Sequence, residues 1–587
     1  MSQTPLSTTP ASAAVPRGLA ESHSLVMALV GSGGDGVALL GDLMLRMAAQ
    51  QGLYGMMVQS YGPQIRGGES AVILRIGRQE TVYEGDRTDI FLCFRLADLK
   101  RFQGAVRLHP QSVVIQEESD TGDLPEWIGR SDRETYRYPF AKIENGIEVP
   151  GDPKNMLALA LLCRVLGWPA ALAREAIGHR FGSRPDVLGR NLAAFDRALA
   201  AAPPPPFPIA PGTGRSLFAE TGNEAIARGA ITAGLRFFAG YPITPSSEIM
   251  ETLIDELPLA GGCVVQAEDE IAALGMVLGA SFGGVPGMTA TSGPGLSLMT
   301  EMTGLSSMAE LPAVIVDCQR AGPATGMPSR TEQADLYHAV FAGHGDFPRA
   351  VLGVFDVVHA REVMYKAFTL SERYQLPVLV LSDAYIAQRR QIRAPVEDSR
   401  VPPERLVWKP GMGPARFDVG GEHGVTPFRV PGNPEGTYLA AGIEHTQEGY
   451  PTADGTIHQQ MNAKRFRKLE AIARDTKDWF RTLGAPHAPR GIIAWGSQYG
   501  LMKEWVAGHP EYRVFLPEIL HPFPIAALDA WRKNLESAAV VEMSYQGQLH
   551  RTLAGLTDLS GVVSVTRSGG TPMKQAELER LLDERRS

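Results

Sequence analysis

Cysteine is scarce in this sequence. The chain has 587 residues and four cysteines, Cys93, Cys163, Cys263 and Cys318, which lie far apart and form no C-x-x-C pair. This spacing argues against a disulfide framework and against a self-contained iron–sulfur or zinc site. We therefore expect all four thiols to be buried packing residues.

An excess of one charge sign is also lacking. Lys and Arg number 56 against 64 Asp and Glu, so the net charge is -8, and neither sign forms a long run. This balance gives no reason to expect nucleic acid or membrane partners. Residues 1–22 have neither a basic start nor an apolar core, so we expect a disordered tail rather than a signal peptide. A cytoplasmic protein is the resulting prediction.

One long stretch, residues 271–300, has no charged side chain and is long enough to span a bilayer. Glycine and proline interrupt it at 283–286 and 293–295, and acidic residues close it at 268–270 and 301. A buried helix, a strand and a second helix fit this pattern better than a membrane span.

The length of the chain predicts about three or four domains. Segment 201–212 is rich in proline and segment 396–435 in proline and glycine, so both are expected to be connectors. Between them, strands alternate with helices, which predicts an α/β fold whose middle domain has a doubly wound, mostly parallel sheet. A mixed-charge helix at 462–481 is expected to be solvated. The three predicted α/β domains are 23–200, 213–395 and 436–587.

Glycines near the amino terminus form a weak motif. Gly31, Gly33 and Gly36 follow an apolar strand and precede a helical pattern, as in the G-x-G-x-x-G loop of Rossmann-like folds. No acidic residue ends a clear second strand about twenty residues later to hold a ribose. A nicotinamide-dependent dehydrogenase therefore stays an alternative. Gly34-Asp35-Gly36 also imitates the start of a magnesium-diphosphate motif, but the asparagine that this motif needs is absent.

Three polar residues of the middle domain are candidates for a site. Thr244 precedes Pro245, which predicts a helix N-cap whose free amides meet a ligand, or a cap alone. Glu270 begins an apolar helix, where burial favours sharing a proton with a ligand nitrogen, although an acid there also complements the helix dipole. Arg320 follows an apolar strand, where a guanidinium holds a carboxylate or serves the structure.

Six short motifs follow one another in the middle domain. They are Gly-Asn-Glu-Ala at 222–225, Tyr-Pro-Ile-Thr-Pro-Ser-Ser at 241–247, Glu-Asp-Glu at 268–270, Thr-Ser-Gly-Pro-Gly at 291–295, Gln-Arg-Ala-Gly-Pro at 319–323 and Thr-Gly-Met-Pro at 325–328. In this order they resemble the α subunit of the 2-oxoacid:ferredoxin oxidoreductases, most closely that of the 2-oxoglutarate enzymes. The amino-terminal domain is similar to the family's γ subunit, fused ahead of α. The carboxy-terminal domain resembles that of transketolase.

The resemblance implies a role for each motif. Glu270 would hydrogen-bond the aminopyrimidine ring of thiamine diphosphate and promote its imino tautomer. Thr244 and Arg320 would hold the keto and carboxylate groups of the 2-oxoacid. Further implied contacts are Pro242, Ile243, Gly293 and Pro294 around the cofactor, and Arg66, Gly67 and Gly68 as an approach to coenzyme A.

The implied reaction is oxidative decarboxylation of 2-oxoglutarate with coenzyme A to succinyl-CoA, carbon dioxide and reduced ferredoxin, and it is reversible. The chain lacks a magnesium-diphosphate motif and cluster cysteines. A separate β subunit would therefore bring Mg2+, the diphosphate half of the site and a four-iron four-sulfur cluster, in an αβ dimer of dimers. No metal is expected on this chain.

The alternatives are pyruvate or a branched-chain 2-oxoacid as substrate, or a non-catalytic scaffold subunit. Candidate cations for a distal carboxylate are Arg66, Arg330, His338 and His344.

Overall fold

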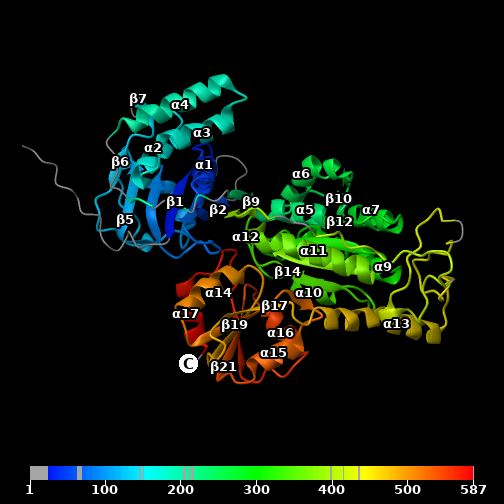
Figure 1. The fold of residues 1–587 in the computed structure, drawn as a ribbon. Helices are drawn as coiled ribbons and strands as arrows, with labels where there is room; N and C mark the ends of the chain where they lie inside the picture. The colour runs from blue at the N-terminus through cyan, green and yellow to red at the C-terminus, as the bar shows by residue number, and fades with distance from the viewer. Residues whose placement is uncertain are drawn as a thin grey trace, which may run out of the picture. The chain divides into compact units, whose positions relative to one another are not determined.

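The chain folds into two compact units, Met1–Phe218 and Ala219–Ser587 (Figure 1). Three large sheets of mainly parallel strands, with helices between the strands in sequence, confirm the α/β class. The structure is a computed structural model, and it describes residues 24–61, 69–144, 147–149, 151–201, 207–209, 212, 214, 217–396, 400–413, 415–433 and 436–585.

The first unit is built on a mixed sheet. Its elements are β1 (Ser24–Ser32), α1 (Val37–Gln50), β2 (Tyr54–Tyr61), β3 (Glu69–Gly77), β4 (Thr88–Cys93), η1 (Leu96–Phe102), β5 (Leu108–Glu117), η2 (Glu126–Ile128), β6 (Tyr136–Tyr138), β7 (Lys142–Glu144), β8 (Ile147–Val149), α2 (Lys154–Leu166), α3 (Ala170–Phe181) and α4 (Pro185–Leu199). Within this unit the strands run in the order β6-β5-β4-β1-β3-β2. Only β3 is antiparallel to its neighbours, β1 and β2.

The glycine-rich loop after β1 is closed by its own aspartate. The Ser32 amide donates to Asp35 Oδ2 at 2.8 Å, and Asp35 Oδ1 pairs with Lys154 Nζ at 3.2 Å. A Cβ at Gly31 would lie 2.9 Å from Asp35 Oδ2, so glycine is needed where this carboxylate packs. The carboxylate takes the place at this amide that a phosphate would otherwise occupy, which favours a structural role for the loop.

The second unit contains a seven-stranded sheet. Its elements up to the connector are β9 (Phe218–Thr221), α5 (Gly222–Thr232), β10 (Phe237–Gly240), α6 (Ser247–Glu256), η3 (Pro258–Ala260), β11 (Cys263–Gln266), α7 (Glu270–Phe282), β12 (Gly287–Thr291), α8 (Gly293–Leu298), α9 (Thr300–Met308), β13 (Ala313–Gln319), α10 (Leu336–Phe341), β14 (Ala350–Gly353), α11 (Val357–Tyr374), β15 (Pro377–Asp383), α12 (Ala384–Gln388) and β16 (Arg390–Arg393). The order is β11-β10-β12-β13-β15-β14-β20, and all pairs are parallel except β14 with β20 (Ile519–His521).

This sheet is covered on both faces, because its central strands β13 and β15 are buried along their whole length and are largely apolar. In β13, Val314 and Val316 belong to a core shared with α5, α6 and α11, whereas Ile315 belongs to a core shared with α7, α8 and α10. The doubly wound arrangement puts the carboxyl ends of the parallel strands at one edge, where ligand sites of such sheets lie.

A five-stranded sheet follows the connector. Its elements are η4 (Glu422–Gly424), α13 (Gly455–Asp475), β17 (Phe480–Gly484), β18 (Arg490–Ala494), α14 (Gln498–Ala507), β19 (Tyr512–Pro517), α15 (Ile525–Arg532), β21 (Ser537–Glu542), α16 (Gln548–Ala554), β22 (Val562–Thr566) and α17 (Gln575–Glu584). The order is β17-β19-β18-β21-β22, and only β17 is antiparallel to its neighbour. Because β20 joins the edge of the seven-stranded sheet, this part is structurally continuous with the middle domain.

Two expectations from the sequence are wrong. Helix α13 is not a solvated helix, because Lys464 and Lys468 are buried and both donate to the carboxylate of Glu310. Cys263 is exposed, because β11 lies at the edge of its sheet. The other three cysteines are buried as predicted.

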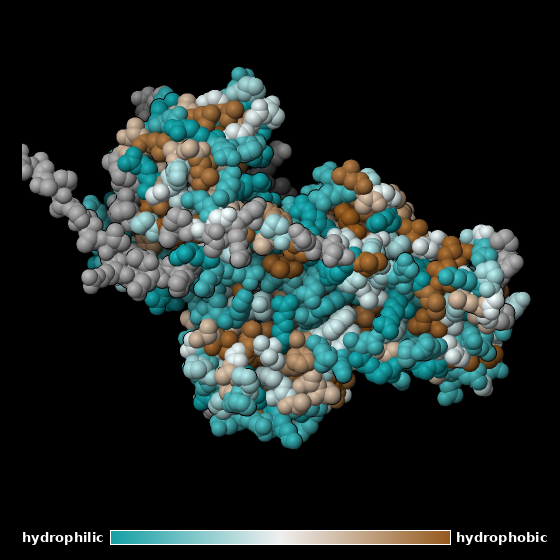
Figure 2. All heavy atoms as spheres, viewed as in Figure 1, coloured by the Kyte–Doolittle hydropathy of each residue, from teal (hydrophilic) through white to brown (hydrophobic). Residues whose placement is uncertain are grey.

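The uncharged stretch 271–300 folds as most of α7, then β12, then α8 and the first residue of α9, as the glycines and prolines predicted. Among the described residues, no helix combines the length and hydropathy that a membrane crossing needs. On the face seen in Figure 2, hydrophilic side chains cover most of the surface and apolar ones form separate patches.

Candidate active site

Glu270 begins α7, and its carboxylate is buried. The helix is capped by the preceding residue, since Asp269 Oδ1 accepts a hydrogen bond from the Ala272 amide at 2.7 Å. Glu270 is only 5% exposed, and its carboxylate makes no hydrogen bond or ion pair within the described residues. Asp269 performs the capping role, so the buried Glu270 carboxylate is available to a ligand.

Glycines hold two loops tightly against buried acids. A Cβ at Gly295 would lie 2.5 Å from Glu270 Oε1 and 2.1 Å from Thr291 Oγ1, so the first turn of α8 packs directly on the Glu270 carboxylate. A Cβ at Gly293 would lie 3.0 Å from Asp335 Oδ2. The Gly-Pro-Gly sequence therefore lets the backbone approach both carboxyls.

The loop that contains Thr244 differs from the prediction. Helix α6 begins at Ser247 with Ser246 as its N-cap, and Thr244 and Pro245 precede it through a cis peptide bond. The Ser246 amide donates to the Ile243 carbonyl at 2.8 Å, and this turn delays the start of the helix. The prediction that Thr244 is the cap is wrong. Its side chain is exposed and is not used for capping.

Arg320 and Thr244 lie together although 76 residues separate them. The Arg320 Nη1 atom donates to the Thr244 carbonyl at 2.7 Å, and Arg320 is 7% exposed. Its Nε has no hydrogen-bond partner among the described residues. The guanidinium thus holds the Thr244 loop. Because arginine has five N–H groups, others remain available to a ligand.

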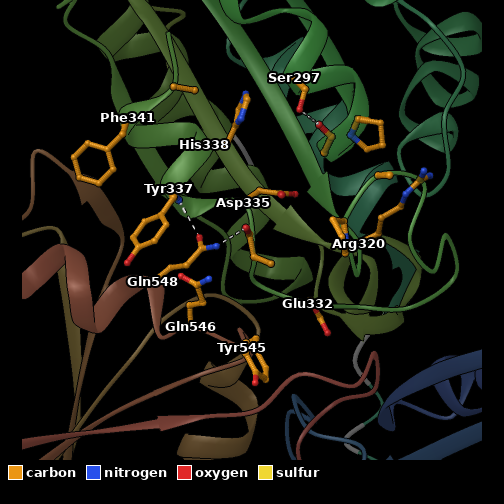
Figure 3. Close-up of a pocket in the computed structure, with 17 residues that line it drawn as sticks. Ser297, Arg320, Glu332, Asp335, Tyr337, His338, Phe341, Tyr545, Gln546 and Gln548 are labelled. Carbon is orange, nitrogen blue, oxygen red and sulfur yellow. Dashed lines mark hydrogen bonds between the residues drawn. The ribbon is translucent and has the colours of Figure 1, made fainter.

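A cavity of about 750 Å3 opens beside Arg320 (Figure 3). Gly293, Pro294 and Arg320, which the sequence analysis singled out, all line it, and Asp335 and His338 line it as well. Burial lowers the pKa of His338, whose Nε2 lies 3.3 Å from the Leu296 carbonyl oxygen. The cavity therefore combines a cation, a carboxyl and a neutral imidazole.

The carboxy-terminal part completes the wall with Tyr545, Gln546 and Gln548 (Figure 3). Gln548 locks this wall to α10, because its Oε1 accepts from the Tyr337 amide at 2.9 Å and its Nε2 donates to the Ala334 carbonyl at 2.7 Å. Residues more than two hundred positions apart therefore share one cavity.

The remaining candidates have different positions. Pro242 is exposed and Ile243 half-buried in the Thr244 loop, and neither lines the cavity. Arg66, Gly67 and Gly68 lie outside the described residues.

The sequence analysis gave no role to Asn223, which is buried. Its Nδ2 donates to the Pro245 carbonyl at 2.7 Å and to Glu248 Oε2 at 2.8 Å. The sequence analysis also missed Asp335, which no motif marked.

Comparisons with known proteins agree with this geometry. The family described as pyruvate flavodoxin/ferredoxin oxidoreductase, thiamine diphosphate-binding, matches residues 228–463, and the family pyruvate ferredoxin/flavodoxin oxidoreductase matches residues 26–201. The α subunit of 2-oxoacid:ferredoxin oxidoreductase 2 from Aeropyrum pernix is 33% identical over 72% of this chain and 70% of that protein. The 2-oxoglutarate oxidoreductase subunit KorA from Mycobacterium tuberculosis is 29% identical over 95% of this chain and 91% of that protein.

A solved structure extends the likeness to the fold. The 2-oxoglutarate:ferredoxin oxidoreductase from Magnetococcus marinus, with 2-oxoglutarate, coenzyme A and succinyl-CoA bound, matches with a TM-score of 0.87 and 31% identity. The match covers 96% of this chain and 100% of that chain. It therefore includes both units and the region of Glu270, Arg320 and the cavity. The chain belongs to the 2-oxoacid:ferredoxin oxidoreductase family, as a homologue of its α subunits.

Proposed function

We propose that this chain is the α subunit of a thiamine-diphosphate-dependent 2-oxoglutarate:ferredoxin oxidoreductase. The enzyme oxidatively decarboxylates 2-oxoglutarate with coenzyme A to succinyl-CoA, carbon dioxide and reduced ferredoxin, and the reaction is reversible. The observation that carries the proposal is the buried Glu270 carboxylate, which has no partner within the described residues and packs on the first turn of α8. A carboxyl on a buried residue with no partner within the described residues suits a ligand that shares a proton with it.

The residues present fit the pyrimidine end of thiamine diphosphate. When bound, this cofactor supplies the nucleophilic carbon and the electron sink for decarboxylation. Glu270 holds a proton at a nitrogen of the aminopyrimidine ring. Gly293, Pro294, Pro242 and Ile243 line the cofactor.

Arg320 and Thr244 hold the 2-oxoacid. The Arg320 guanidinium binds the C1 carboxylate with N–H groups that the Thr244 carbonyl leaves free. The Thr244 hydroxyl, which is not spent on a helix cap, donates to the keto oxygen. His338 is our candidate for the distal carboxylate, because it lines the same cavity as Arg320 and a bound carboxylate favours its protonated form, in which both ring nitrogens donate.

The other half of the site comes from a partner. The β subunit brings Mg2+, the diphosphate contacts and a four-iron four-sulfur cluster, and the assembly is an αβ dimer of dimers that passes electrons to ferredoxin. Exposed apolar side chains on the helices beside the site support a covered surface: Ile254 of α6 is 52% exposed, and Ile271 and Met276 of α7 are 48% and 40% exposed. The relative from Aeropyrum pernix is named as an α subunit, which also supports a separate partner subunit.

Turnover by the assembled complex tests this function. We expect the α chain alone to turn over no 2-oxoacid. With its β subunit, we expect kcat/KM for 2-oxoglutarate to exceed that for pyruvate and 2-oxoisovalerate by about tenfold or more. Neither of the latter two has a second carboxylate, so each leaves the polar groups that bind this carboxylate without a partner. A preference for pyruvate would overturn the substrate assignment.

Replacing Thr244 with valine tests the role of the hydroxyl separately from the fold. Valine keeps the backbone carbonyl that Arg320 holds and removes only the hydroxyl. We expect kcat/KM for the 2-oxoacid to fall about tenfold or more, the cost of one lost hydrogen bond to a reacting group, with an unchanged melting temperature. Thr252→Val is the matched control, since that hydroxyl only donates to the Glu248 carbonyl within α6. Equal kinetics in both variants would remove Thr244 from the site.

A further inference from the structure

The carboxyls of Asp317 and Asp335 interact electrostatically, and Asp335 lines the same cavity as Arg320. Asp317, in β13, is fully buried, and neither of its carboxyl oxygens has a hydrogen-bond donor among the described residues. Asp335 lines the cavity and its Oδ2 also lacks a donor. Two ionised carboxylates offer only acceptors, so a hydrogen bond between them exists only when they share a proton.

The surroundings keep this acid pair in place. The Asp335 amide donates to Gln319 Oε1 at 3.1 Å, and Gln319 Nε2 donates to the Ser382 carbonyl at 3.0 Å. Gly293 packs against the Asp335 carboxyl, where a Cβ would lie 3.0 Å from Oδ2. The carboxyls therefore have little room to separate, and burial together with their mutual repulsion disfavours the doubly ionised state.

Among the described residues, Arg320, Glu332 and His338 are charged or titratable groups that share the cavity wall with Asp335. Arg320 interacts with both carboxyls and favours their ionised forms, and Glu332, also on the cavity wall, opposes ionisation of Asp335. Burial and its neighbour raise the pKa of Asp317 well above its usual range, and burial raises the pKa of Asp335 to about 6. At neutral pH the pair therefore holds one proton and one negative charge, next to the positive Arg320.

We propose that the Asp317–Asp335 pair sets the charge that Arg320 presents to the substrate, so that binding of the 2-oxoacid carboxylate is accompanied by uptake of a proton onto the pair. The inference rests on the proposed function of Arg320. An ionised pair weakens the positive potential that the guanidinium presents to the substrate, whereas a fully protonated pair does not. Asp335 is thus a positioning residue that acts through Arg320.

The linkage has a definite sign. A bound anion beside Asp335 favours its protonated form, so substrate binding raises its pKa, and by reciprocity protonation strengthens substrate binding. A rise of one pKa unit on binding corresponds to about a tenfold weaker affinity at high pH than at low pH. The affinity is therefore greatest below about pH 6, falls as Asp335 ionises, and reaches a plateau above the pKa of the bound state.

The inhibition constant of 2-hydroxyglutarate for the assembled holoenzyme measures this linkage. This compound carries the same C1 carboxylate but cannot be decarboxylated. In the unmodified enzyme we expect its inhibition constant to rise about fivefold between about pH 6 and pH 8. In the double variant Asp317→Asn, Asp335→Asn, whose amides reproduce the hydrogen bond without a titrating proton, we expect no such rise. Glu332→Gln removes a charge from the same wall and should retain the pH dependence.

Calorimetry keeps the inference testable if the double variant fails to fold. Binding of 2-hydroxyglutarate to the unmodified holoenzyme, measured near neutral pH in two buffers of different ionisation enthalpy, should show net proton uptake. No uptake, or an unchanged pH profile in a folded double variant, would overturn the inference while leaving the proposed function intact. An assembled complex that turned over no 2-oxoacid would instead contradict the proposed function.

Discussion

Replacing Glu270 with glutamine is expected to lower 2-oxoacid turnover by the assembled enzyme by about 100- to 10,000-fold, the usual range for loss of a positioned acid–base group. Glutamine has the same shape, so the packing against Gly295 and Thr291 is preserved. What is lost is the carboxyl that shares a proton with a nitrogen of the cofactor ring. The measurement is kcat under saturating substrate, with cofactor content and subunit assembly determined in parallel.

Glu268 supplies the matched control for this experiment. It lies two residues earlier in the same acidic triplet and is exposed, whereas Glu270 is buried. We expect Glu268→Gln to leave turnover within about twofold of the original, as for most surface substitutions. If the two variants behaved alike, with kcat unimpaired, Glu270 would be a structural helix residue and the catalytic proposal would fail.

Replacing Glu310 with glutamine is expected to destabilise the larger unit by about 3–5 kcal/mol, the cost of leaving buried charges without their partner. Glu310 is fully buried in the turn that follows α9, and its carboxylate accepts hydrogen bonds from Lys464 and Lys468 of α13. The Arg416 guanidinium also donates to the Glu310 carbonyl at 3.0 Å. Glutamine keeps the volume and removes the charge that compensates the two ammonium groups.

The pH dependence of this loss has a definite sign. Burial lowers the pKa of Lys464 to about 7 and that of Lys468 to about 8, below the ordinary value of 10.5. The folded state therefore binds fewer protons than the unfolded state in this window, and the free energy of unfolding rises with pH. Without Glu310 both pKa values fall further, so the destabilisation is greatest near pH 6 and smaller near pH 10.

Urea unfolding followed by circular dichroism measures the destabilisation. Glu470→Gln is the matched control, because Glu470 is exposed on the same helix, and its replacement should change the unfolding free energy by less than about 0.5 kcal/mol. A loss below about 1 kcal/mol for Glu310→Gln, or a loss that grows with pH, would contradict the role of the buried cluster.

Local patterns were enough to predict much of the fold. The alternation of strands with helices and the interruptions of 271–300 by glycine and proline depend on neighbouring residues, and both predictions agree with the structure. The family and the α/β class followed from short motifs, because each motif is a contiguous run whose order along the chain is itself distinctive. The same motifs marked Glu270 and Arg320 as candidates.

Ion pairs between residues far apart in the chain could not be predicted from the sequence. Lys464 and Glu310 are 154 positions apart, so α13 looked like a solvated, mixed-charge helix until the fold brought the two together. Thr244 looked like an N-cap because a threonine before proline usually is one, but a turn closed by Ser246 moved the helix start. Cys263 was exposed by the position of its strand at a sheet edge, which no local pattern encodes.

The sequence by itself determined the class of fold and the family and named Thr244, Glu270 and Arg320 as candidates, because these depend on composition, periodicity and contiguous motifs. Only the tertiary structure decided which of them share a cavity. It placed the Thr244 carbonyl on Arg320, the Asp335 carboxyl in the cavity that Arg320 lines, and Gln548 against α10. Burial then decided their charges, since a carboxyl's proton affinity depends on the neighbours that folding brings to it.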